Sequence, residues 1–315
     1  MNTSASTPIY RSFDLQRDFA TLVSLLNDVE QADHSGEDIT EATLREQLTW
    51  SGQDPAPNNW VVTLPGSTSL IGFGSIQKTS NDDNADLYIS VHPSSRRQGI
   101  GSQLLARILD RACKLNAQAA RVYVNVQHRA AILFVRKHGF APVSTYTRLT
   151  APGKQTFPTP TLPQGFTTRS YDRIQRLDLY TQAMNRCYEG LWGHLHTTED
   201  EVAGWLPQLN HAGIFFLFAP DGTIAGVCRA DLSEHLTTQR GAPTALIDAP
   251  GVVTAYRNSN LYLPLLLTTM HWLLPQSPAT LELESWSDAP DTLALYRSIG
   301  FTTMKEEISY RLDLR

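Results

Sequence analysis

The amino-acid sequence predicts an α/β protein made of two similar halves. Between residues 87 and 91, apolar and polar residues alternate, which is typical of a half-buried strand. From Ile100 to Leu115, apolar residues recur every three or four positions and predict a helix with one apolar face. A similar succession of elements returns in the second half of the chain, beyond a proline-rich stretch over 151–165.

The first elements are a short strand over 8–13, a helix that Asp14 is placed to cap, and two strands over 60–64 and 69–76. Pro65-Gly66 joins these two strands as a hairpin. An acidic segment lies between the helix and the hairpin, and it contains Asp28, Glu30, Asp33, Glu37, Asp38 and Glu41. Two interpretations remain open for this segment: a solvated connection between two helices, or an acceptor-site wall that attracts a cationic amine.

The loop that follows the strand over 87–91 has the composition of an anion-binding site. Gly99 and Gly101 stand where the helix begins, and they lack the β-carbons that would keep a ligand away from the backbone. The first amides of a helix have no intrahelical acceptor, and the helix dipole favours an anion there. Arg96 and Arg97 add two permanent positive charges. The loop is therefore either a pyrophosphate cradle or a tight turn before a surface helix.

After this helix, residues 121–126 predict a strand and residues 130–137 a short helix that ends at Gly139. Phe140 opens the last pair of strands. The stretch over 151–165 contains four prolines and has neither helical nor strand periodicity, so it predicts an extended linker.

The second half repeats the first at a constant offset. Val91 and Val252 are 161 positions apart (252 − 91), as are Arg96 and Arg257. The same offset relates Leu104 to Leu265, Leu105 to Leu266, Gly139 to Gly300, and Phe140 to Phe301. A hairpin also recurs, with strands over 214–219 and 224–229 and the turn Asp221-Gly222.

The spacing Arg-x-x-Gly-x-Gly, from Arg96 to Gly101, resembles the acetyl-CoA loop of the GNAT acetyltransferase superfamily. The preceding Val-x-Pro resembles the end of that family's strand, and AAILFVRKHGF (130–140) resembles its helix that ends in Gly-Phe. The resemblance covers most of residues 60–140 and implies acetyl-CoA as co-substrate, with loop amides on the pyrophosphate and the strand edge on the pantetheine arm. The cofactor-binding residues so implied are Val91, His92, Pro93, Arg96, Arg97, Gln98, Gly99, Ile100, Gly101, Ser102 and His128.

Together with the repeat, this resemblance predicts two tandem GNAT-like domains, each a mixed, mainly antiparallel sheet flanked by helices. The N-terminal domain would span 1–150 with an intact CoA loop. The C-terminal domain would span 166–315 with a degenerate CoA loop, after the linker over 151–165. In the second loop Asn260 replaces Gly99 and Tyr262 replaces Gly101, so we expect it to bind CoA weakly or not at all.

The two halves also differ where the family has its general acid. Many GNAT enzymes have a tyrosine four residues before the glycine of Gly-Phe, which protonates the leaving thiolate. Tyr296 occupies this place in the second half and Val135 in the first, while His128 and Ala289 stand where the family often has asparagine. Tyr296 is therefore either the proton donor or a packed residue on a helix face.

The tandem arrangement resembles mycothiol synthase and its relatives, in which transfer is attributed to the C-terminal half. The loops of this chain favour the opposite assignment for CoA binding. Four residues lie where the first helices of the second half should meet: Tyr188, Trp192, His194 and His196. They are expected either to line an acceptor pocket or to form a contact between domains.

Charge and cysteine content exclude several classes of protein. A chain of 315 residues with 26 Lys and Arg against 31 Asp and Glu is long enough for two domains and too acidic for a general nucleic-acid partner. Three separated cysteines form no disulfide framework, and His194 and His196 lack a third metal ligand. The N-terminus has no apolar signal region, and no apolar run approaches the ~18 residues of a membrane span. We expect a cytoplasmic protein without a metal or membrane site.

The expected reaction is direct transfer of an acetyl group from acetyl-CoA to the amine of a small molecule or peptide. The attacking amine must be neutral, so a base or a water relay takes its proton, and the candidates are Asp86, Tyr88 and Glu30. A backbone amide, that of Val91 or His92, would stabilise the charge on the thioester oxygen. The alternative is a non-catalytic acyl-CoA-binding sensor or scaffold, which Val135 in place of the tyrosine favours.

Overall fold

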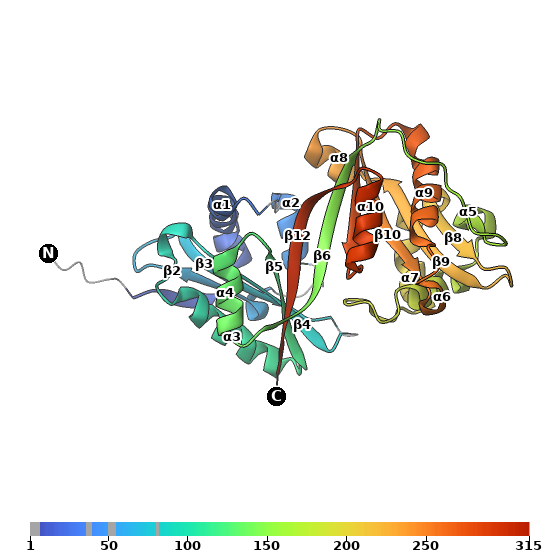
Figure 1. Cartoon of the computed structure of the whole chain (residues 1–315). Helices are drawn as coiled ribbons and strands as arrows, with labels where there is room; N and C mark the ends of the chain where they lie inside the picture. The colour runs from blue at the N-terminus through green and yellow to red at the C-terminus, as the bar shows by residue number, and fades with distance from the viewer. Residues whose placement is uncertain (1–6, 36–39, 50–54, 80–81, 315) are drawn as a thin grey trace. The chain divides into compact units, whose positions relative to one another are not determined.

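The computed structural model describes residues 7–35, 40–49, 55–79 and 82–314, and the chain forms two compact units. The first unit comprises Met1–Val143 and Ile308–Arg315, and the second comprises Ser144–Glu307. Both units are α/β structures with mainly antiparallel sheets flanked by helices, as the sequence predicted (Figure 1).

The first unit contains a sheet in the order β1-β2-β3-β4-β5, with β12 beside β5. Strands β1 to β4 pair antiparallel in succession, and β4 pairs with β5 in parallel. Its elements are β1 (Ile9–Ser12), α1 (Leu15–Asp33), α2 (Glu41–Thr49), β2 (Asn59–Thr63), β3 (Leu70–Gln77), β4 (Asn84–Val91), α3 (Ile100–Lys114), β5 (Ala119–Asn125) and α4 (Arg129–Lys137).

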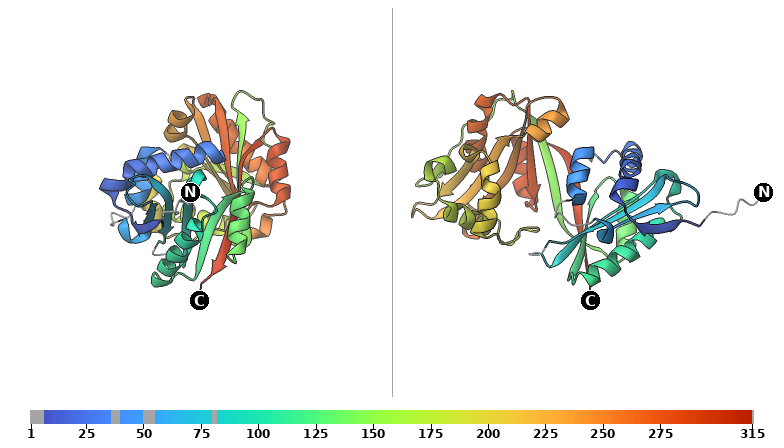
Figure 2. Two further views of the ribbon diagram at one scale, coloured as in Figure 1. Left: turned by 90° about the vertical axis from the view of Figure 1, so that its left-hand side faces the viewer. Right: turned by 180° about the vertical axis from the view of Figure 1, so that it is seen from behind.

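Helices cover both faces of this sheet, and Figures 1 and 2 show the two layers from opposite sides. On one face, Phe19 and Leu22 of α1 are buried in a cluster with Phe73 of β3. On the other, Leu105 of α3 and Val135 of α4 are buried in a second cluster. These contacts hold α1, α3 and α4 against the sheet, and α3 is the helix that directly follows the predicted cofactor loop.

The local signals in this unit are confirmed. The Asp14 side chain caps α1 by accepting hydrogen bonds from the amides of Gln16 and Arg17. Gly66 lies in the left-handed region at the predicted hairpin, and Gly139 does so after α4. These signals were readable because each depends on residues close together in the sequence.

The second unit repeats the first. Its sheet has the order β6-β11-β10-β9-β8-β7, in which β10 and β11 pair in parallel as β4 and β5 do. The predicted internal repeat is thereby confirmed. Its elements are β6 (Ala141–Pro152), β7 (Thr167–Ser170), α5 (Tyr171–Ile174), α6 (Leu177–Cys187), α7 (Glu199–Trp205), β8 (Ile214–Phe218), β9 (Ile224–Leu232), α8 (Glu234–Arg240), β10 (Thr244–Val252), α9 (Tyr262–Leu273), β11 (Thr280–Trp286), α10 (Pro290–Ser298) and β12 (Thr302–Asp313). Strand β6 begins in the first unit, and strand β12 ends in it.

The predicted domain boundaries need correction. The stretch over 151–165 does not separate the two units, because Ala151 and Pro152 end strand β6, Phe157 is buried in the core of the second unit, and the whole stretch lies within that unit. The C-terminal domain does not extend to residue 315, because residues 308–315 belong to the first unit. There the Leu314 amide donates to the Gln118 carbonyl at 2.7 Å, and the Tyr310 ring is fully buried.

The burial of Tyr310 predicts that β12 supports the core of the first unit. Tyr310→Ala should lower the free energy of unfolding by about 3–5 kcal/mol, as truncation of other buried aromatic residues does. Tyr310→Phe is the matched control, because the Tyr310 hydroxyl is buried with no hydrogen-bond partner among the described residues. Removing that hydroxyl should be neutral or slightly stabilising. Urea denaturation measures the free energy of unfolding of both variants. A loss of less than about 1 kcal/mol in Tyr310→Ala would contradict this placement.

Candidate functional site

The site begins where β4 stops pairing with β5. The parallel register joins Asn84 to Ala119 and ends at the pair Asp86 and Arg121. β4 nevertheless continues to pair with β3 as far as Val91. The edge of β4 from 87 to 91 therefore leaves the β5 ladder, and its backbone groups on that side have no ladder partner, although the Val91 carbonyl accepts from Arg96.

The direction of the backbone amides at the end of β4 distinguishes Val91 from His92, the two predicted hydrogen-bond donors to a thioester oxygen. The His92 amide already donates to the Ile71 carbonyl of β3 at 3.0 Å. Successive amides of a strand point to opposite sides, so the Val91 amide points away from β3, toward the open edge. Val91 is therefore the better placed of the two predicted donors.

The loop after β4 forms the sharp bend that the two glycines predicted. Gly99 lies in the left-handed region with φ +84° and caps α3, whose first turn begins at Ile100. A β-carbon on Gly101 would lie 3.5 Å from the Phe134 ring, which is an ordinary contact, so packing does not require glycine there. Ile100 is buried, which anchors the first turn of α3. The amides of this turn precede the first intrahelical bond, from Gln103 to Gly99, and are available to an anion.

The two loop arginines have different surroundings. Arg97 is exposed, in the left-handed region with φ 63°. Arg96 instead donates from Nε to the Val91 carbonyl at 3.0 Å. Its two terminal nitrogens donate to the two carboxylate oxygens of Asp33, at 2.7 and 2.8 Å. The charge of Arg96 is therefore neutralised within the protein.

The other predicted loop residues are also placed by local contacts. Pro93 opens a short turn over Pro93–Ser95, and Gln98 is exposed next to Gly99. The Ser102 hydroxyl lies 3.1 Å from His138 Nε2, at the end of α4. The Ser102 hydroxyl therefore has a protein partner, and its backbone amide remains the group available to a ligand.

The end of α1 meets the loops that follow β4 and β5, a junction that the sequence did not predict. His92 Nε2 lies 3.5 Å from the Asp28 carboxylate. His128 Nε2 lies 3.0 Å from the backbone carbonyl of Asp33. The only signal for this junction was the acidic composition of the segment that contains Asp28 and Asp33.

The three candidates for proton acceptance in the first unit fall in different environments. Tyr88 lies on β4, half-buried beside Phe73. Glu30 lies on α1 and accepts a hydrogen bond from the Ser35 hydroxyl. Asp86 lies on the last paired rung of β4 and β5, where Arg121 donates to both of its oxygens at 2.7 and 2.9 Å. The structure thus gives Asp86 an ion pair that holds the two strands together.

In the second unit the corresponding loop keeps its bend but has larger side chains where the first loop has glycines. Asn260 takes the place of Gly99 in the left-handed region, with φ 53°, which asparagine tolerates better than most residues. Tyr262 opens α9 and is half-buried. A β-carbon on Gly251, just before the end of β10, would lie 2.7 Å from the Tyr188 ring. Aromatic rings therefore pack both at the loop and beside the strand end.

Tyr296 is fully buried on α10, and its hydroxyl lies 3.3 Å from the Asp288 carboxylate. Burial raises the pKa of Asp288 to about 6, against the opposing hydrogen bonds from Ser285 and Tyr296. Burial and the Asp288 charge raise the pKa of the Tyr296 phenol well above its usual value. The Tyr296 phenol is therefore protonated, fully buried and hydrogen-bonded within its own unit.

The predicted cluster after α6 contacts the second unit's own residues. The Tyr188 hydroxyl donates to the Ala249 carbonyl at 3.1 Å, and the His194 ring lies beside the Tyr188 ring. Burial lowers the pKa of His194. The Trp192 carbonyl accepts from the Ser287 hydroxyl, at 3.4 Å. His196 is exposed, so it lies at the edge of this cluster.

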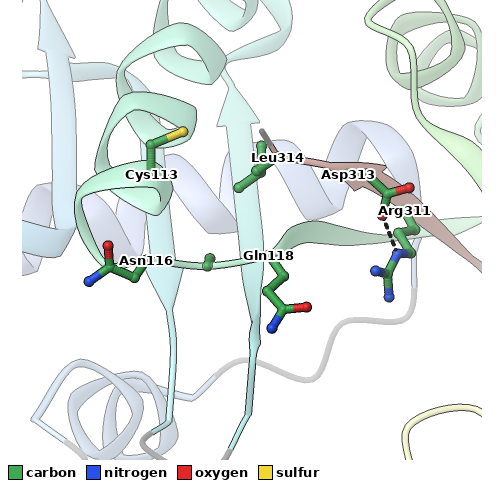
Figure 3. A pocket seen from close by; sticks show the side chains of 7 residues that line it. Cys113, Asn116, Gln118, Arg311, Asp313 and Leu314 are labelled. Atoms are coloured by element: carbon green, nitrogen blue, oxygen red, sulfur yellow. Dashed lines mark hydrogen bonds and ion pairs between the residues drawn. The ribbon is translucent and has the colours of Figure 1, made fainter.

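A pocket at the other end of α3 contains none of the predicted site residues (Figure 3). Its lining includes Cys113, Asn116 and Gln118, together with the ion pair of Arg311 and Asp313 at 2.7 Å. The rise of a 15-residue helix separates it from the loop by about 22 Å. Within the described residues, no group of His, Cys, Asp or Glu side chains is arranged to hold a metal. None of the described helices has the length and apolar character of a membrane span.

Comparison with known proteins agrees with this architecture. Residues 58–142 match the acetyltransferase (GNAT) domain family. The mycothiol acetyltransferase of Tsukamurella paurometabola is 27% identical over 230 residues, which cover 70% of this chain and 75% of that protein. The mycothiol acetyltransferase of Rhodococcus erythropolis is 24% identical over 258 residues, covering 79% and 83%.

Two solved structures share the fold along almost the whole chain. A GCN5-related N-acetyltransferase from Sphaerobacter thermophilus has a TM-score of 0.76 at 20% identity, covering 98% of this chain and 96% of that one. A tandem GNAT protein from the clavulanic acid biosynthesis pathway has a TM-score of 0.65 at 16% identity, covering 98% of both chains. Residues 58–142 therefore match a GNAT acetyltransferase domain, in a chain that has the fold of tandem GNAT proteins.

Proposed function

We propose that the protein is an acetyl-CoA-dependent N-acetyltransferase that acts on an amine of a small molecule or peptide by direct transfer, with its cofactor bound in the first unit. The observation that carries the proposal is the left-handed Gly99 and the uncovered first turn of α3, next to the open edge of β4. The two relatives are named as acetyltransferases of mycothiol, which supports a small-molecule acceptor.

Each part of acetyl-CoA would then meet a different backbone feature. The amides of Ile100, Gly101 and Ser102 would bind the pyrophosphate at the helix N-terminus. The open edge of β4 would pair with the amides of the pantetheine arm. The Val91 amide would donate to the thioester oxygen as negative charge develops there.

Proton transfer would use the carboxylate or phenol nearest the acceptor. Glu30 and Tyr88 remain the candidates for taking the amine proton, directly or through water. We leave Asp86 out of this role, because both of its carboxylate oxygens accept from Arg121 and tie it to the strand ladder. The first unit has the buried Val135 at the position of the family's tyrosine, so the thiolate would leave without a tyrosine proton donor. A thiol of pKa about 8.5 is a fair leaving group without that assistance.

A second candidate function is non-catalytic binding of an acyl-CoA, as in a sensor or scaffold. The observation that favours it is Val135 in place of the tyrosine. Release of free thiol from acetyl-CoA with a panel of small amines and peptides separates the two functions. Calorimetric binding of CoA without thiol release on any amine would support the sensor and contradict the transferase.

Replacing Gly101 by tyrosine should abolish cofactor binding, because it copies the residue of the second loop into the space the diphosphate needs. Gly101→Tyr should weaken CoA binding at least tenfold and reduce thiol release in parallel. Gly101→Ala is the matched control, since its β-carbon meets Phe134 at an ordinary 3.5 Å and the helix gains propensity. Unchanged CoA affinity in a folded Gly101→Tyr variant would refute the placement of the site.

We further propose that Tyr296 and Asp288 serve packing in the second unit. Because the Asp288 carboxyl has a raised pKa when folded, it is protonated in the folded chain and ionised in the unfolded chain between about pH 4 and 6. Its contribution to stability is therefore present below pH 4 and is lost as the pH rises through 6.

Asp288→Asn should consequently make the protein more stable than the wild type at pH 7.5, with unchanged acetyl transfer. The variant and the wild type should differ less at pH 4. Urea denaturation at several pH values tests this. The control is Asp291→Asn, which alters an exposed carboxylate in the first turn of α10 and should give no such gain. Loss of acetyl transfer in a stable Asp288→Asn variant would instead indicate that the pair takes part in the reaction.

A further inference from the structure

We propose that Arg96 is a positioning residue that clamps the cofactor loop to the end of α1 through Asp33, and that it is not a ligand of the diphosphate. The inference deepens the proposed function and rests on it. It also separates the roles of the two adjacent arginines, since only Arg97 is exposed on the loop.

The first argument is the geometry of Arg96. Three of its five N–H donors are already used, one on the Val91 carbonyl and two on the Asp33 carboxylate. The paired bonds of 2.7 and 2.8 Å have the parallel arrangement in which a guanidinium binds a carboxylate most strongly. Unless it displaced Asp33, a ligand phosphate could use only the one remaining N–H on each terminal nitrogen.

The second argument is the place of Asp33. It is the last residue of α1, and the helix ends there because His34 adopts the left-handed conformation, with φ 51°. The Asp33 side chain holds the segment after β4, and its backbone carbonyl accepts from His128, after β5. One residue thus joins the end of α1 to the segments that follow both strands.

The third argument is the second unit, where the phosphate-binding features are lost and the arginine contact remains. Arg257 Nε donates to the Val252 carbonyl at 3.0 Å, as Arg96 does to Val91. A terminal nitrogen of Arg257 donates to the carbonyls of Cys187 and Glu189, at the end of α6, which corresponds to α1. The arginine therefore ties the strand end to the first helix in both units, although only the first unit has the glycine loop.

The clamp and a diphosphate ligand predict opposite results for Asp33→Asn. If Arg96 bound the diphosphate, removing the Asp33 charge would free the guanidinium and raise the affinity for the CoA anion. If the pair is a clamp, the variant loosens the loop, and CoA affinity should fall by roughly fivefold, the upper range for a partly exposed ion pair. Calorimetric titration of the full chain with CoA measures whether the affinity of the Asp33→Asn variant rises or falls. A rise or no change overturns the proposal.

Arg97→Gln is the matched control, because it removes a charge from the same loop without touching Asp33. It should weaken CoA binding and flatten its dependence on salt, whereas Asp33→Asn should weaken binding without flattening the salt dependence. Asp33→Glu retains the carboxylate and should recover part of the affinity. Equal flattening of the salt dependence in both variants would contradict the separation of roles.

A second readout does not require CoA. Amide hydrogen exchange over residues 92–99 should be faster in Asp33→Asn than in the wild type, since the loop loses its tie to α1. If the wild type bound no CoA, the proposed function would be wrong, but the hydrogen-exchange measurement would still test whether Arg96 and Asp33 hold the loop. Faster exchange supports it, and unchanged exchange overturns it. Arg257→Gln should speed exchange in the second loop alone and leave CoA affinity unchanged.

Discussion

The divergence of β4 from β5 is the constraint on which the first unit's site depends. The pairing of the two strands ends at Asp86 and Arg121, and this rung is held by two hydrogen bonds between the side chains. Arg121 also binds the buried Asp82 at 2.6 Å. Burial alone would raise the pKa of Asp82, but its hydrogen bonds and the Arg121 charge outweigh burial and lower it. A network of side-chain hydrogen bonds among Asp82, Asp86 and Arg121 thus holds the last paired rung, beyond which the open strand edge begins.

The two units share one backbone arrangement, but in the second unit aromatic side chains pack beside the strand end and at the loop. In the second unit, the parallel ladder extends from Thr244 to Asp248, and the Tyr188 hydroxyl binds the next carbonyl, that of Ala249. Asn260 preserves the left-handed bend without glycine, while Tyr262, the first residue of α9, packs against the core of the second unit. The packing that holds the strand, loop and helix together therefore does not depend on the groups that would bind a phosphate.

Features that depend on neighbouring residues could be read from the sequence. The hairpin at Gly66, the cap at Asp14 and the bend at Gly99 each follow from local conformational preference, and the repeat follows from a constant offset. Contacts between distant residues could not be read. Arg96 and Asp33 are 63 positions apart, and the pairing of Asp86 with Arg121 depends on strand register. Residues 308–315 belong to the first unit, which is otherwise formed by the N-terminal part of the chain. No local sequence pattern predicts a contact between segments so far apart.

The central claim is that one helix N-terminus, that of α3, holds the cofactor. Amide hydrogen exchange of the full chain with and without CoA tests this most directly, because it reports on both loops in one experiment. The account predicts slower exchange with CoA at residues 87–91 and 100–102, and no change at residues 257–264. Slower exchange at residues 257–264, or no change at residues 100–102 with CoA demonstrably bound, would contradict it.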